Sequence, residues 1–197
     1  MTLDQPALGS VATASTWPQP AISWAAIWAG AAVAVAVSMA LTLAAAGIGY
    51  AIGFPGLASR ASLSAFTPEV GAGAVVVQVL SGALGGYVAG RIRTIWVGLH
   101  DDESHFRDTA HGLIAWAVAT IAGVLLAALV LAPYAEQLAA ASSVVPIAAA
   151  DSQRAAGLAA QSSLFIAVGM LLSAFVAAVA ARVGGLRHEA MHARKRG

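Results

Sequence analysis

Four long apolar stretches, separated by polar segments, dominate the pattern of the chain. They cover about residues 22–50, 70–92, 109–132 and 162–183. A helix needs about 20 consecutive apolar residues to cross a hydrocarbon core some 30 Å thick, and all four stretches meet this length. The first of them contains no charged residue. The pattern therefore predicts an all-α fold, an integral membrane bundle of four transmembrane helices.

Small residues recur at every fourth position in all four predicted helices, which places them along one face of each helix. In lipid, such faces let helix backbones approach each other closely. The candidate packing positions, among them a glycine zipper in the second helix, are Gly30, Ala34, Ser38, Gly82, Gly86, Gly90, Gly123, Gly169 and Ser173. These faces join helices of one chain or helices of different subunits, and the pattern leaves both arrangements open.

The end of the second helix resembles the end of the fourth. LGGYVAGR, Leu84–Arg91, aligns with FVAAVAAR, Phe175–Arg182, and each segment ends with small residues and an arginine. Such an internal repeat predicts two helical hairpins that lie in parallel orientation.

Composition supports a membrane location. The 197 residues are 59% hydrophobic and only 10% charged, whereas soluble proteins carry about a quarter charged residues. There is no cysteine, which excludes disulfides and thiolate metal sites. We expect a disordered arm over residues 1–21 and a basic tail over residues 184–197.

The distribution of the cations predicts the orientation in the membrane. Arg60 and Arg154 lie in the first and third loops, and the other eight of the ten Lys and Arg residues lie in the central loop, the tail or the adjacent helix ends. By the positive-inside rule, both termini and the central loop face the cytoplasm. The expected location is the bacterial inner membrane.

The sharpest catalytic motif is His188-Glu189-Ala190-Met191-His192, an H-E-x-x-H pattern typical of zinc proteases. It lies in the basic tail rather than on a helix held against a cleft, and no third ligand follows it. We interpret this match as incidental and expect no enzyme and no cofactor. A shared metal site between central loop and tail is the alternative, with candidate ligands His100, His105, His188 and His192.

Several polar residues have structural interpretations. Gln78, inside the second helix, is expected to donate a hydrogen bond to another helix. Asp108 or Thr109 is expected to cap the third helix, and acidic residues of the central loop to pair with nearby arginines. His111 is expected to bond across to the neighbouring hairpin. The basic tail is too short to favour nucleic-acid binding over contact with lipid.

Three segments carry a family resemblance. They are SWAAIWAG (Ser23–Gly30), GGYVAGR (Gly85–Arg91) and FRDTAHGLIAWAVAT (Phe106–Thr120). The chain resembles a group of small proteobacterial membrane proteins, some labelled PhnA-like, and its pattern is similar to the four-helix family of the Bacillus membrane protein YrzE. The resemblance implies a four-helix integral membrane protein of unassigned function. It supplies no catalytic residue and implies no phosphonate chemistry.

The leading hypothesis is a non-enzymatic protein of the lipid bilayer that acts through helix–helix association, as a homo-oligomer or as an accessory subunit of a membrane complex. Small-residue faces on all four helices, beside little intramembrane chemistry, support it. One alternative is a small-solute channel lined by Gln78, Ser38, Thr42 and Ser173. The other is the metal site described above.

Overall fold

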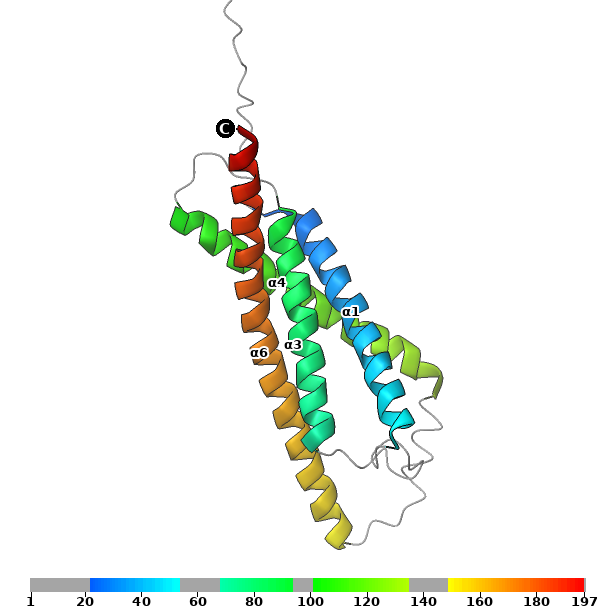
Figure 1. Ribbon diagram of the computed structural model, residues 1–197. Coiled ribbons are helices and arrows are strands. Elements are labelled where there is room, and N and C mark those ends of the chain that lie inside the picture. Colours follow the sequence, from blue (N-terminus) through cyan, green and yellow to red (C-terminus); the bar gives the residue numbers. More distant parts are fainter. Residues whose placement is uncertain (1–21, 54–67, 94–100, 135–148, 197) are drawn as a thin grey trace, which may run out of the picture.

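The computed structural model describes residues 22–53, 68–93, 101–134 and 149–196 and consists of long helices packed together (Figure 1). Each long helix contains a segment apolar and long enough to cross a membrane. The all-α four-helix prediction is therefore confirmed. The elements are α1 Trp24–Ala51, α3 Pro68–Arg91, α4 Asp101–Leu131, the short 3-10 helix η1 Ala132–Tyr134, and α6 Ala149–Arg196.

Two helices extend well beyond the predicted apolar stretches. α4 begins at Asp101 rather than near residue 109. An acidic first turn suits the positive end of the helix dipole, and Glu103 bonds Arg107 one turn later at 2.7 Å. Asp108 therefore lies inside the helix, and the expectation that it caps the helix was wrong.

α6 continues to Arg196, so the basic segment after residue 183 belongs to the same helix. Gly184 and Gly185 do not end it. A Cβ at Gly184 would meet the carbonyl oxygen of Tyr87, and one at Gly185 would meet the Asp108 carboxylate. These glycines therefore let α6 lie directly against α3 and α4, and this packing supports a helix that glycine would otherwise weaken.

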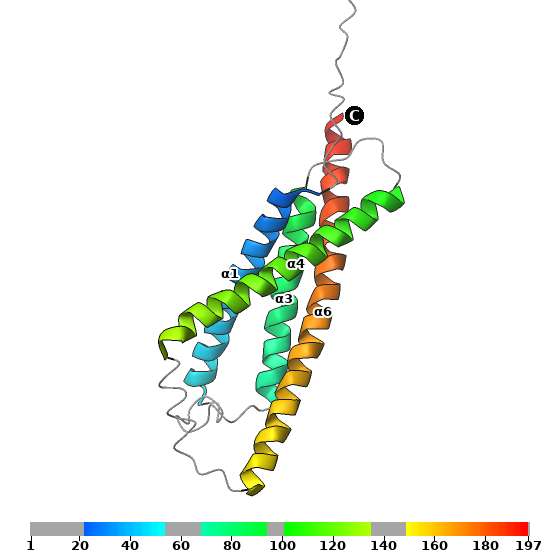
Figure 2. The same ribbon diagram turned by 180° about the vertical axis from the view of Figure 1, so that it is seen from behind.

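The helices form two hairpins, α1 with α3 and α4 with α6 (Figure 1). α3 and α6 run parallel to each other, and α4 crosses the other helices obliquely (Figure 2). One end of the bundle contains the ion-paired residues Arg93, Asp108 and Glu189, and we call it the charged end. The opposite end, where α1 finishes and α3 begins, is called the open end.

The glycine zipper of α3 packs against α6. A Cβ at Gly82 would meet Ser173, one at Gly86 would meet Ala177, and one at Gly90 would meet Ala181. In the alignment of Leu84–Arg91 with Phe175–Arg182, the last two pairs join equivalent positions. Equivalent residues of two parallel helices meet when an approximate two-fold axis runs between them, so this register supports the two-hairpin repeat.

Small residues also position the other two helices. A Cβ at Gly30 of α1 would lie 2.6 Å from the carbonyl oxygen of Gly85, and one at Gly85 would lie 2.7 Å from the Cβ of Ala34. On the other side, Gly112 of α4 lies against Ala177. Both pairings lie in the half of the bundle next to the charged end, which we call the charged half, and the other half is called the open half. They place the helix backbones in direct contact.

Among the described residues, the apolar core is confined to the charged half. Beyond it, α1 is exposed from Thr42 to Ile48 and α4 from Val124 to Leu131. A Cβ added at Gly123 would find nothing within 4 Å, so this candidate packing position contacts no other described helix. The buried apolar residues are Ala26, Ile27, Ala31, Ala34, Ala89, Ala115, Ala177 and Ala181.

We predict opposite effects for two glycine-to-alanine variants. Gly86→Ala forces a methyl group into the carbonyl of Ala177 and should lower the free energy of unfolding by about 1–3 kcal/mol. Gly123→Ala meets open space and should raise it by about 0.5–1 kcal/mol, because alanine favours the helix. Reversible unfolding in mixed micelles measures both. Equal effects at the two positions would contradict the packing described here.

Candidate functional site

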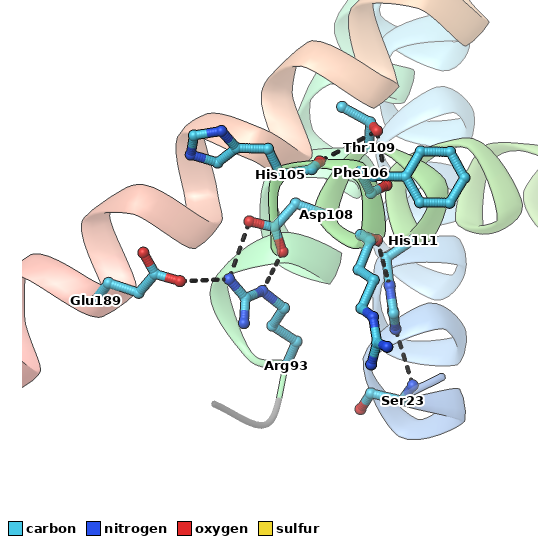
Figure 3. Close-up of polar contacts among 9 residues, drawn as sticks. Ser23, Arg93, His105, Phe106, Asp108, Thr109, His111 and Glu189 are labelled. Atoms are coloured by element: carbon cyan, nitrogen blue, oxygen red, sulfur yellow. Dashed lines mark hydrogen bonds and ion pairs between the residues drawn. The ribbon is translucent and has the colours of Figure 1, made fainter. Parts of the chain in front are cut away.

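Arg93, Asp108 and Glu189 form a buried ion cluster at the charged end (Figure 3). Arg93 follows the last turn of α3, Asp108 belongs to α4 and Glu189 belongs to α6. Arg93 Nη2 donates to Asp108 Oδ2 at 3.0 Å and to Glu189 Oε1 at 2.8 Å. Arg93 Nε contacts the second Asp108 oxygen. One guanidinium thus joins three helices.

The cluster is strongly desolvated at its centre. The side chains of Arg93 and Asp108 are each 1% exposed, whereas that of Glu189 is 40% exposed. A two-point guanidinium–carboxylate contact has defined geometry and strong hydrogen bonds. Burying both charges costs solvation energy, so the pair contributes more to fixing the helices than to net stability. Loss of one partner alone would leave an uncompensated buried charge.

A second polar contact joins the two hairpins. His111 of α4 is 2% exposed, and its Nε2 accepts the backbone N–H of Ser23 at 2.8 Å. Its Nδ1 lies 2.6 Å from the carbonyl oxygen of Arg107, and donation there requires the proton on Nδ1. The arrangement therefore uses the neutral ring. His111 satisfies a backbone donor at the start of α1, in agreement with the expected bond across to the neighbouring hairpin.

The described candidate metal ligands have other neighbours or pair only along one helix. His105 contacts Arg182 at 3.4 Å, and the rings of His188 and His192 lie 4.6 Å apart on α6. His100 lies outside the described residues. No group of three or more potential ligands comes together in the described part of the chain.

The H-E-x-x-H pattern lies on a helix, so the expectation that it lies in a tail outside a helix was wrong. Its glutamate has another partner. Glu189 is bound to the guanidinium of Arg93, which turns this carboxylate toward α3 and α4. A metalloprotease glutamate must instead face a metal-bound water. The contacts therefore assign Glu189 to the ion cluster.

A group of adjoining cavities lies between the helices in the middle and toward the open end. A cavity of about 290 Å³ is lined by residues of all four helices, including Ser38, Gln78 and Ser173. A larger one of about 680 Å³ lies between α1 and α3 and includes Thr42. A third, of about 420 Å³, is a groove between α1 and α4. All three share Ser38.

The hydrogen bonds at this depth differ from the expectation for Gln78. Ser173 Oγ donates to the backbone carbonyl of Gln78 at 2.8 Å, which joins α6 to α3. The side-chain amide of Gln78 has no hydrogen-bond partner among the described residues. Its Oε1 faces Gly169, where a Cβ would lie 2.6 Å away. Ser38 Oγ donates within its own helix, to the carbonyl of Val35 at 2.8 Å.

One member of the ion cluster, Glu189, is not predicted from the sequence. The sequence predicts pairing between arginines and acids of the central loop, but it places Glu189 only in the H-E-x-x-H pattern. The Glu189 carboxylate reaches Arg93 because α6 continues as a helix through two glycines. Packing against α3 supports this continuation, and no local sequence pattern indicates it.

Comparison with family models, curated proteins and solved structures finds no match to this chain.

We predict that Arg93→Gln lowers the free energy of unfolding by about 3–5 kcal/mol, because it leaves the Asp108 carboxylate buried without a cation. Arg107→Gln disrupts the partly exposed pair with Glu103 and should cost only about 0.3–0.5 kcal/mol. The double variant Arg93→Met with Asp108→Leu should recover most of the loss. Unfolding in mixed micelles measures all three, and a double variant that loses as much stability as Arg93→Gln, or more, would disprove the coupling.

Proposed function

We propose that this protein is a non-enzymatic integral membrane protein that acts through helix–helix association, as a homo-oligomer. The two halves of the bundle differ in how much helix surface is covered within one chain. In the charged half the small-residue faces are already used inside the chain, at Gly30, Gly86 and Gly90. In the open half the helices leave apolar surface uncovered.

The observation that carries the proposal is the groove between α1 and α4. It has a volume of about 420 Å³ and is lined by apolar residues such as Met39, Leu43 and Leu126 together with Gly123. The glycine lies in open space, which lets another helix backbone approach. A transmembrane helix of a second copy would cover these apolar residues and matches the chemistry of this groove.

The non-enzymatic part of the proposal rests on the polar clusters. Glu189 is bound to Arg93, and Asp108 is bound to the same guanidinium. Both ring nitrogens of His111 form hydrogen bonds with backbone groups. These side chains fix helices relative to each other, and this use explains their burial without a reaction.

The proposed orientation places the charged end and both termini in the cytoplasm of a bacterial cell. The distribution of cations along the chain supports it, because eight of the ten lie in the central loop, the tail and the adjacent helix ends. Arg93, which anchors the ion cluster, belongs to this set.

A solute pathway is the second candidate. Three of the four proposed lining residues, Ser38, Gln78 and Ser173, border one cavity. Toward the charged end, however, Gly86 lies against Ala177 and Gly90 against Ala181, with no space for a further methyl group. A continuous path would require α3 and α6 to separate, so association is the better supported function.

The association proposal predicts that Gly123→Leu shifts the protein from oligomer to monomer without unfolding it. The added side chain finds open space within one chain but occupies the groove that a second copy needs. Mass measurement of the complex in mild detergent gives the oligomeric state.

Gly157→Leu is the matched control, because Gly157 of α6 also has open space around it and lies outside the groove. It should leave the oligomer intact. A wild-type protein that is monomeric in both detergent and native membranes would overturn the proposal. Co-purification of a different membrane protein that Gly123→Leu releases would assign the groove to an accessory-subunit role instead.

A further inference from the structure

The cavities in the middle of the bundle surround one polar group that has no hydrogen-bond partner in the described part of the chain. Gln78 lines both the 290 Å³ cavity and the 680 Å³ cavity between α1 and α3. Its side-chain amide offers two N–H donors and one carbonyl acceptor. Among the described residues, none of these has a hydrogen-bond partner.

Contact between an amide without hydrogen bonds and the hydrocarbon of the membrane has a free-energy cost. Moving such a group from water into an apolar medium costs about 4–8 kcal/mol when nothing bonds it. Lipid acyl chains offer no donor or acceptor, so an occupant that bonds Gln78 is strongly favoured over lipid. The hydroxyl groups of Ser38 and Thr42 line the same space and provide further polar contacts.

The space has room for such an occupant and leads toward the open end. At about 30 Å³ per molecule, 680 Å³ holds on the order of 20 water molecules. Its walls include Ile52 near the end of α1 and Glu69 in the first turn of α3, so the cavity reaches the open end of both helices.

The same space is closed toward the charged end. Gly82 lies against Ser173, and Gly86 lies against Ala177, one turn further along α3. Gly30 lies against Gly85 on the α1 side. Backbone contacts of this kind leave no path between the helices, so the space is blind.

We propose that these cavities form a blind, water-accessible vestibule that opens at the open end and binds a small, hydrogen-bonding solute at Gln78. The vestibule does not rest on the association function, because all the residues that line it belong to one chain.

Cysteine accessibility tests this directly, because the native chain contains no cysteine. Val77 lines the vestibule, whereas its neighbour Val76 is 56% exposed and lines none of the three cavities. Thiols react as thiolates, which form in water and not in hydrocarbon. The probe is a small, membrane-impermeant methanethiosulfonate with a quaternary ammonium group, applied to the protein in proteoliposomes.

Val77→Cys and Thr42→Cys should react at least tenfold faster than Val76→Cys when the probe is added at the open end. From the charged end, Val77→Cys should react no faster than Val76→Cys. Equal rates for the lining and control positions from the open end would overturn the vestibule. Equal rates for Val77→Cys from both ends would overturn its being blind.

Gln78→Leu tests the role of the amide, since leucine has a similar size and no hydrogen-bonding group. In the Val77→Cys background it should slow labelling at least tenfold, because water loses its partner at the floor of the vestibule. Unchanged labelling would show that Gln78 does not hold the occupant. Gln78→Glu should keep the fast labelling, which separates lost hydrogen bonding from a general effect of substitution.

Discussion

The close approach of α3 and α6 is the contact on which the rest of the structure depends. Gly82, Gly86 and Gly90 bring the backbone of one helix directly against Ser173, Ala177 and Ala181 of the other. In lipid no hydrophobic force drives helices together, so close packing and interhelical hydrogen bonds must provide the stability. The bond from Ser173 to the Gln78 carbonyl reinforces the same contact. With this pair in place, α1 packs against α3 and α4 packs against α6 in the charged half, and His111 joins α4 to the start of α1.

Two buried polar contacts then fix the ends of the helices. Arg93 holds α4 and α6 through two carboxylates, and His111 holds the first backbone N–H of the α1 region. Both contacts lie at the charged end, where the small-residue packing is also closest. The result is a bundle with one firmly joined half and one half in which α1 and α4 have few neighbours. The groove and the vestibule both follow from this asymmetry.

The sequence was sufficient to predict the helices and their small-residue faces, because both depend on local patterns of apolar and small residues. It could not show which glycines contact another helix and which face open space. Gly86 and Gly123 both belong to faces with a small residue at every fourth position, yet one meets a carbonyl and the other open space, since α4 crosses the bundle obliquely. Gln78 illustrates the same limit. Its pattern predicted an interhelical bond from the side chain, but the backbone carbonyl accepts the bond and the amide faces a cavity.

The charged half is held together within one chain and the open half is not. Pairs of spin labels on the cysteine-free chain test this difference, in lipid nanodiscs that hold a single copy. One pair replaces the exposed residues Trp28 and Leu113 of α1 and α4 in the charged half, and the other replaces Ile48 and Leu129 in the open half. We expect a narrow distance distribution for the first pair and a broad one for the second. Equally narrow distributions at both ends would contradict this difference between the two halves.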